Sequence, residues 1–166
     1  GCKIHYDIIK DYDGEFSSKM TSLSIKHNFL IIEDRKFNDI SYIVSKQYEK
    51  FRNWVDMVTI HSLVTTNVIR ELSGCLIVAN MSNNNYDFSS EAEELARKCH
   101  NNVVGFITQK RINLDEMVSM TPGIGLSNNQ IGDQKHRESN EVDTDFIIVG
   151  RGIYLGDFNE IEDRVK

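Results

Sequence analysis

Short runs of apolar residues alternate along this chain with longer stretches in which apolar residues recur every three or four positions. The runs predict strands over residues 2–9, 29–32, 55–60, 75–79, 103–107, 117–120 and 146–149. The longer stretches predict helices over residues 14–27, 39–51, 66–72, 89–100 and 157–165. Regular alternation of strand and helix is typical of βαβ units, and therefore of a parallel sheet.

The predicted strands are continuous apolar runs, as expected when both faces of a parallel sheet are covered. Polar residues that could carry chemistry lie within or just after them: Lys3, His5, Asp34, Lys36, His61, Ser82 and Arg151. In a parallel barrel, the carboxyl ends of the strands meet at one rim, where active sites form.

We therefore predict an α/β fold, a TIM-type (β/α) barrel of about seven parallel strands, in a single domain over residues 1–166. An open doubly wound sheet is the rival, although no glycine-rich dinucleotide turn follows any strand. The polar segment 124–142 is expected to form a mobile loop on the rim.

Composition and net charge limit the classes of function that this chain could have. Of the 166 residues, 40% are hydrophobic and 27% are charged, which is ordinary for a globular domain. The net charge of −6 disfavours binding to nucleic acid or to an anionic membrane, and no apolar run approaches the roughly 20 residues of a membrane span. Cys2, Cys75 and Cys99 are odd in number and lack metal-ligand spacing, so we expect free thiols in a reducing, cytoplasmic compartment.

One stretch, residues 29–39 (FLIIEDRKFND), joins a strand-like apolar run to a charged segment. In an extended chain the side chains alternate between faces, so Asp34 and Lys36 point the same way. A carboxylate and an ammonium on one face at the end of a buried strand is the layout of an active site. A solvent-exposed run of charged residues after an edge strand would have the same sequence. The local pattern does not decide between this interpretation and an active site.

This stretch and six others resemble motifs of one enzyme family. Residues 33–39 (EDRKFND) are similar to the signature EDRKFADIGNT of orotidine 5'-phosphate decarboxylase, the decarboxylase domain of uridine monophosphate synthase. The other matching segments are CKIHYD at 2–7, WVDMVTIH at 54–61, LIVANMS at 76–82, VVGFIT at 103–108, TPGIGL at 121–126 and VGRGIY at 149–154. One motif would be a weak signal, but matches in the family's order along nearly the whole chain identify it as a member of this family.

The resemblance implies a (β/α)8 barrel that dimerises across its open rim. It implies conversion of orotidine 5'-monophosphate to UMP and CO2 in pyrimidine biosynthesis, without metal or organic cofactor. The family's charged array falls on Lys3, Asp34, Lys36 and Asp39. Lys36 would protonate the carbon that CO2 leaves, Asp34 would hold Lys36, Lys3 would lie beside the ribose, and Asp39 would reach into the partner's site. Fixed charges need no reorganisation as carbanion charge develops. A structural ion pair is the alternative for Asp34 and Lys36.

The same motifs place Ser82, Pro122 and Arg151 at the substrate. Ser82 would contact the pyrimidine, and Pro122 lies in the matched segment TPGIGL. Arg151 would pair with the phosphate as a forked donor, between two glycines that let a phosphate approach the backbone. Ser82 could instead cap the chain after its strand. His5 and His61 fit hydrogen-bonded histidines at strand ends better than catalytic bases.

Three departures from the family pattern point away from activity. The chain begins within what resembles the second strand, so the barrel is expected to lack the family's first strand and helix and to carry two unpaired edges. Ile43 stands where the family has a threonine. The phosphate loop, GDQKHRE at 132–138, lacks the family's Gln and Tyr, which leaves Lys135 and Arg137 as candidate replacements.

From these departures we favour a degenerate decarboxylase homologue, a pseudoenzyme that serves as a nucleotide- or protein-binding module. Its ligands would be orotidine 5'-monophosphate or UMP, and it would form a homodimer or a complex with another protein. The alternative is an active decarboxylase that uses the intact charged array. A longer natural sequence that supplies the first strand would favour this alternative.

Overall fold

The computed structural model describes residues 1–83, 85–125, 130–131 and 134–154. Its strands are β1 (Cys2–Ile4), β2 (Ile31–Phe37), β3 (Met57–His61), β4 (Cys75–Val78), β5 (Val103–Ile107), β6 (Val118–Ile124), β7 (Gln130–Ile131), β8 (Gln134–Lys135) and β9 (Phe146–Val149). Its α-helices are α1 (Gly14–His27), α2 (Ser41–Tyr48), α3 (Thr66–Arg70), α4 (Ser89–Lys98) and α5 (Arg151–Tyr154), and its 3-10 helices are η1 (Tyr6–Ile8) and η2 (Ser139–Glu141). None of the helices in these ranges is long and apolar enough to cross a membrane.

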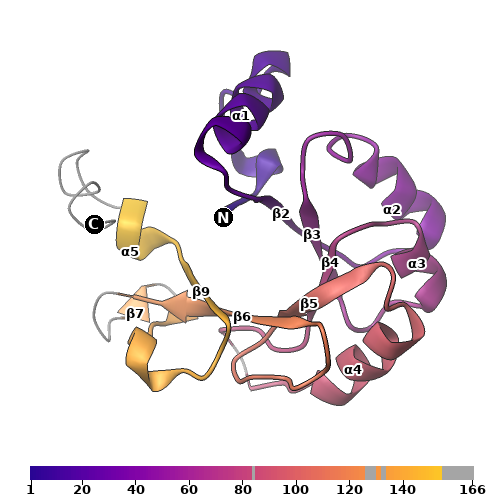
Figure 1. Cartoon of the computed structure of the whole chain (residues 1–166), viewed down its shortest axis with the longest axis vertical. Coiled ribbons are helices and arrows are strands. Elements are labelled where there is room, and N and C mark those ends of the chain that lie inside the picture. The colour runs from indigo at the N-terminus through magenta and orange to yellow at the C-terminus, as the bar shows by residue number, and fades with distance from the viewer. Residues whose placement is uncertain (84, 126–129, 132–133, 155–166) are drawn as a thin grey trace.

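Seven parallel strands form one curled sheet in the order β1-β2-β3-β4-β5-β6-β9. Helices α2, α3 and α4 cover its convex side, and its two edges face each other across an open side between α1 and α5 (Figure 1). Strands β1 and β9 are not paired with each other among the described residues, so the curl is an incomplete barrel. The strand order follows the chain without reversal, which excludes a doubly wound sheet. The predicted α/β fold, an incomplete barrel of seven parallel strands, is confirmed.

Element boundaries agree best with the sequence where a segment is uniformly apolar or well capped. β5 and β9 have the predicted bounds, and so does α1. Helix α1 begins where the Asp13 carboxylate accepts hydrogen bonds from the backbone N–H groups of Glu15 (3.0 Å) and Phe16 (2.9 Å). It ends at Asn28, which takes the left-handed conformation common at helix ends.

Two strands are longer than predicted, and one predicted loop contains structure. β2 does not stop at Ile32 but continues through the charged segment to Phe37, and β6 continues through Pro122. In the segment expected to be a rim loop, β7 pairs with β8 as a short antiparallel hairpin and η2 follows. The helix predicted over 157–165 lies outside the described residues.

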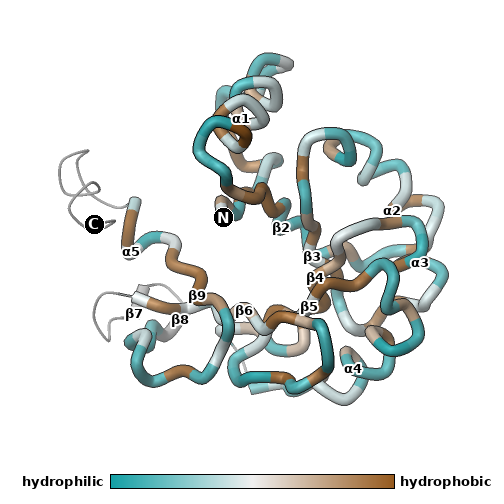
Figure 2. The backbone as a smooth tube through the Cα atoms, in the orientation of Figure 1, coloured by the Kyte–Doolittle hydropathy of each residue, from teal (hydrophilic) through white to brown (hydrophobic). Residues whose placement is uncertain are grey.

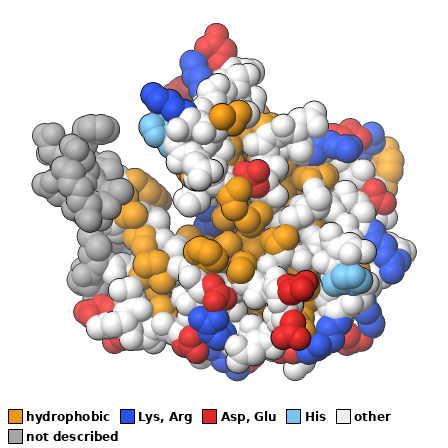
Figure 3. All heavy atoms as spheres, in the orientation of Figure 1, with side chains coloured by type: hydrophobic (Ala, Val, Ile, Leu, Met, Phe, Trp, Pro, Cys, Tyr) orange, Lys and Arg blue, Asp and Glu red, His pale blue; other side chains and the backbone are white. Residues whose placement is uncertain are grey.

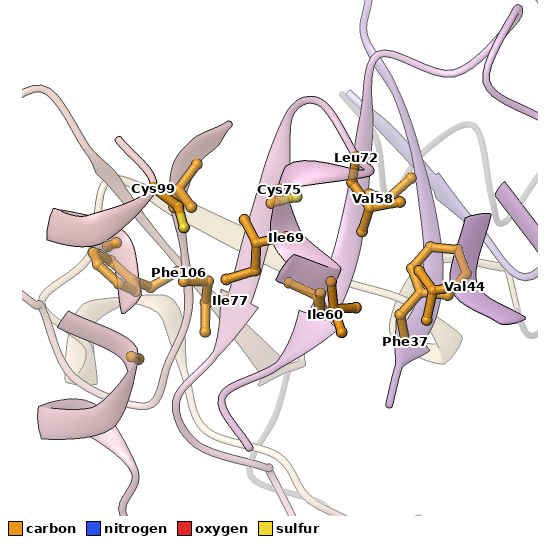
Figure 4. Packing of buried hydrophobic residues seen from close by; sticks show 14 of the residues in the cluster. Phe37, Val44, Val58, Ile60, Ile69, Leu72, Cys75, Ile77, Cys99 and Phe106 are labelled. Atoms are coloured by element: carbon orange, nitrogen blue, oxygen red, sulfur yellow. The ribbon is translucent and has the colours of Figure 1, made fainter. Parts of the chain in front are cut away.

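The apolar core has two layers, one on each face of the sheet. On β4, Cys75 and Ile77 point to the convex side and join the outer layer beneath the helices, whereas Leu76 and Val78 point to the concave side. Side chains of α2, α3 and α4 fill the outer layer (Figure 4). Apolar residues therefore concentrate on the strands, between polar outer helical faces and the concave interior (Figure 2). This two-sided burial explains why the strands are continuous apolar runs.

Candidate active site

The concave side of the sheet encloses an open cavity of about 940 Å³. Its apolar wall comes from inner-layer residues such as Ile32, Met57 and Ile107. The space-filling view shows the molecule hollowed between α1 and the C-terminal strands, with hydrophobic side chains gathered around the hollow (Figure 3). Polar side chains enter this cavity mainly where strands end: Lys3, His5, Asp34, Lys36, Asn80, Ser82, Asn83, His136 and Arg151.

The centre of the polar cluster is Asp34, whose carboxylate has four donors around it. Lys36 Nζ lies 2.8 Å from Oδ1, and the Thr59 hydroxyl donates to the same oxygen at 2.9 Å. Lys3 Nζ contacts Oδ2, and His5 Nε2 lies 3.3 Å from that oxygen. Both oxygens of the carboxylate therefore have partners within the protein. Asp34 is held as a fixed counter-charge.

The surroundings of Asp34 also fix its charge. Burial alone would raise the pKa of Asp34, but the hydrogen bond from His5 and the positive charges of Lys3 and Lys36 outweigh burial. They hold the pKa of Asp34 far below its usual value. The Asp34 side chain is 8% exposed, whereas the lysine side chains are 20% and 27% exposed. The ammonium groups can therefore meet a ligand in the cavity while the carboxylate stays behind them.

Lys36 is held in an unusual backbone conformation. Its φ is +50°, in the left-handed region that residues with a side chain rarely adopt. The pairing of β2 with β3 shifts register between Glu33 and Phe37, around this residue. The backbone N–H of Lys36 donates to Thr59 Oγ1 at 2.8 Å. The irregular pairing and this bond thus set the backbone from which the Lys36 side chain reaches Asp34 and the cavity.

The structure brings together three of the four residues expected to form the array. Lys3, Asp34 and Lys36 meet in the cavity. Asp39 is exposed on the rim after β2, and its carboxylate accepts a hydrogen bond from the backbone N–H of Ile40 at 2.7 Å. Asp39 does not line the cavity of its own chain.

The residues expected to bind substrate line the same cavity. Ser82 follows β4, Pro122 lies in β6, and Arg151 begins α5 after β9. Arg137, a candidate phosphate cation, is instead engaged by Gln109, whose backbone carbonyl and side-chain oxygen accept from its guanidinium at 3.1 and 2.8 Å. Its neighbour His136 lines the cavity and was not predicted. The side chain of Lys135 lies outside the described residues.

The histidines expected at strand ends differ from each other. His5 contacts Asp34, as expected of a hydrogen-bonded histidine. His61 Nδ1 is buried without a partner in the described part of the chain, so that expectation is not met at this atom. Burial and the positive charge of Lys36 lower the pKa of His61. His61 is therefore a neutral neighbour of the array.

Glu33, on the opposite face of β2 from Asp34, is a buried carboxyl outside the cavity. Its side chain accepts from the backbone N–H of Tyr6 at 3.2 and 3.4 Å. Burial raises the pKa of Glu33 to about 7, and the bond from Tyr6 offsets only part of that effect. Sequence analysis did not single out Glu33, because a run of charged residues does not indicate which of its carboxyl groups is buried away from water.

No cluster of three His, Cys, Asp or Glu side chains that could hold a metal occurs within the described ranges. The site is built instead from lysines and carboxylates at the carboxyl ends of parallel strands, on the concave face of a curled sheet. That arrangement defines the class: a TIM-type barrel protein whose site lies at the strand ends.

Comparison with known proteins gives the family. Residues 1–159 match the model of the orotidine 5'-phosphate decarboxylase / HUMPS family, and the chain belongs to this family. It is 36% identical to orotidine 5'-phosphate decarboxylase of Phycomyces blakesleeanus, over 99% of this chain and 70% of that protein. It is 34% identical to uridine 5'-monophosphate synthase of Bos taurus, over 96% of this chain and 38% of that protein.

Solved structures support the fold. The orotidine 5'-monophosphate decarboxylase of Metallosphaera sedula superposes with a TM-score of 0.70 at 18% identity, over 99% of this chain and 84% of that one. The enzyme from Methanocaldococcus jannaschii, in complex with the inhibitor BMP, gives a TM-score of 0.65 at 20% identity, over 98% of this chain and 81% of that one. The curled parallel sheet is thus the fold of these decarboxylases.

Proposed function

We propose that this protein decarboxylates orotidine 5'-monophosphate to UMP in pyrimidine biosynthesis. The observation that carries the proposal is the assembled array, in which Asp34 lies between Lys3 and Lys36 with both carboxylate oxygens paired. A charged cluster retained only as a scaffold would not need two partly exposed ammonium groups turned into a cavity of about 940 Å³.

The chemistry required of these residues is limited. The bond between the pyrimidine ring and its carboxylate breaks, the electron pair stays on the ring carbon, and CO2 leaves. Lys36 Nζ then gives a proton to that carbon, which yields UMP. Positive charge placed in advance beside the developing carbanion lowers the barrier without reorganisation. The Asp34 carboxylate, 2.8 Å from Lys36 Nζ, holds in place the ammonium group from which the proton comes.

The cavity also contains candidates for binding the phosphate. Arg151 follows β9 and is the cation expected to pair with it, and His136 lines the same cavity. Arg137 is held by Gln109 and takes no part in this proposal. Binding energy from a phosphate remote from the reacting carbon helps to hold the substrate in a reactive geometry.

Exposed apolar residues on the rim support a homodimer as part of this proposal. Large apolar side chains are exposed in the segments that follow the first four strands: Ile8, Ile40, Tyr42, Leu63 and Tyr86. The carboxyl ends of neighbouring parallel strands share one rim, and apolar residues gathered on one surface mark interaction sites. Asp39 lies on this rim, where it could reach the site of a second copy. We expect Tyr42→Glu to shift the protein toward monomer in sedimentation.

The location proposed is cytoplasmic. All three cysteines are free thiols. Free thiols persist in reducing compartments.

The test is the loss of orotidine 5'-monophosphate absorbance with time at high protein concentration. Turnover should vanish in Lys36→Ala and persist in Lys19→Ala, a matched control whose lysine pairs with Glu15 on the surface of α1. Equal rates in the wild type and Lys36→Ala would refute the proposal. Calorimetry with UMP would then test the nucleotide-binding pseudoenzyme that the sequence departures favoured.

The contribution of Asp39 can be tested by mixing two inactive variants. If Asp39 serves the partner's site, mixed dimers of Asp39→Asn and Lys36→Ala contain one intact site. Random mixing should then restore about a quarter of wild-type activity. No recovery in a preparation that sedimentation shows to contain mixed dimers would refute the assignment of Asp39 to the partner's site.

A further inference from the structure

Thr59 is a buried polar residue in the middle of β3, and both of its hydrogen bonds lead to the charged array. The strand around it is apolar: Val58 and Ile60 join the outer layer, and Met57 packs against the inner one. Thr59 itself is fully buried and faces Leu76 in the sheet register. A hydroxyl in such a place costs free energy unless it is hydrogen-bonded.

The two bonds of Thr59 form a directed chain. The backbone N–H of Lys36 donates to Thr59 Oγ1 at 2.8 Å, and the same hydroxyl donates to Asp34 Oδ1 at 2.9 Å. The hydroxyl proton points to the carboxylate, because an ionised carboxylate has no proton to donate and a backbone N–H cannot accept one. One side chain therefore sets both the backbone of the proton donor and the orientation of its counter-charge.

The backbone of Lys36 needs such support. A lysine at φ +50° is strained, and the register shift in β2 interrupts the normal strand pairing at this point. Thr59 supplies the N–H of Lys36 with an acceptor. Without it, the strained backbone at Lys36 would relax, and Lys36 Nζ would move from its present place 2.8 Å from Asp34 Oδ1.

We propose that Thr59 is a positioning residue for decarboxylation, which holds Lys36 in its left-handed conformation and fixes the Asp34 carboxylate against it. This inference rests on the proposed decarboxylase function for its kinetic part. Its structural part, that the hydroxyl maintains the geometry of Lys36, does not depend on turnover.

The kinetic experiment compares Thr59→Val, which keeps the shape and removes both hydrogen bonds, with Thr59→Ser, which keeps the hydroxyl. For orotidine 5'-monophosphate we expect kcat of Thr59→Val to fall about 10- to 100-fold, as for loss of a bond to a charged group, with KM changed less than about threefold. Thr59→Ser should keep kcat within about threefold of the wild type.

Thr121→Val is the matched control. Thr121 is equally buried, and its hydroxyl has no hydrogen-bond partner in the described part of the chain, so this variant also removes a buried hydroxyl. We expect its kcat to equal that of the wild type. An equal fall in kcat for Thr59→Val and Thr121→Val would overturn the proposal, because general loosening of the sheet would then explain both.

Amide hydrogen exchange at Lys36 separates this proposal from the proposed function. The Lys36 N–H should be protected in the wild type and Thr59→Ser and exchange at least about tenfold faster in Thr59→Val. If the wild type turns nothing over but this pattern holds, only the decarboxylase proposal fails. Unchanged exchange in Thr59→Val would overturn the role of Thr59 whatever the activity. If Thr59→Val does not fold, Thr59→Ala takes its place in both measurements.

Discussion

Because Glu33 is protonated in the folded protein, the free energy of unfolding should fall as the pH rises. The pKa of Glu33 is about 7 in the folded chain, against a usual value of 4.5. Between these values the folded state binds a proton that the unfolded state has released, so stability is full below pH 4.5 and falls until about pH 7. A shift of this size corresponds to roughly 3 kcal/mol, at 1.36 kcal/mol per pKa unit.

The assay is urea unfolding at pH 5 and pH 8, compared between the wild type and Glu33→Gln. Glutamine keeps the shape of the side chain and an oxygen to accept from the N–H of Tyr6, but it does not titrate. The wild type should lose stability relative to Glu33→Gln by about 3 kcal/mol on going to pH 8. The comparison is needed because the lowered pKa of His61 works in the opposite direction: it favours the folded state as pH rises through 6.5.

Glu94→Gln is the control for this prediction. Glu94 is exposed and pairs with Lys98, which lowers its pKa, so folding does not make this carboxyl retain a proton between pH 5 and pH 8. Its removal should leave the pH dependence unchanged. Identical pH dependence in the wild type and Glu33→Gln would refute the reasoning that burial keeps Glu33 protonated.

Three further predictions concern the site and the sheet. Asp34→Asn should lower kcat by about a hundredfold or more and destabilise the fold by about 3 kcal/mol in urea unfolding, because two lysines lose their shared counter-charge. Gly105→Ala should cost about 3 kcal/mol in the same assay, since a Cβ at this position would lie 2.1 Å from a backbone oxygen of β6. Arg151→Ala should raise KM roughly a hundredfold, whereas Arg137→Ala should change it less than about threefold; similar effects of the two would contradict the assignment of Arg151 to the phosphate.

The sequence predicts the architecture because the architecture depends on periodicity. Continuous apolar runs at β4, β5 and β9 and the capped helix α1 were identifiable from their own residues. β2 was predicted too short, because four charged residues in a row indicate the end of a strand. In the structure these charges are compensated locally: Asp34 is ringed by donors, and Arg35 lies near Asp7 with 3.8 Å between Nη1 and Oδ2. A charged segment can therefore remain inside a sheet.

The candidate site is less predictable than the fold, because its supporting residues carry no local signal. The positions of Lys3, Asp34 and Lys36 were indicated by motif resemblance and are now seen together. Thr59 looks like an ordinary β-branched strand residue. Its hydrogen bond with the backbone N–H of Lys36 lies where the pairing of β2 with β3 shifts register, which the sequence does not show. Sequence analysis named Arg137 and not His136 as a candidate, although His136 lines the cavity. The sequence does not indicate which of two adjacent side chains faces a cavity.

Strand β2 carries a consequence for folding itself. Phe37 packs in the outer layer and Glu33 is buried outside the cavity, whereas Asp34 and Lys36 line the cavity. A slip of one residue against β3 would drive Asp34 and Lys36 into the outer apolar layer and send Phe37 into the cavity. Each misplaced charge would lose its partners in a dry environment. The groups proposed to carry the chemistry would thus also disfavour misregistered sheets, so the charges that make the site help to specify the fold.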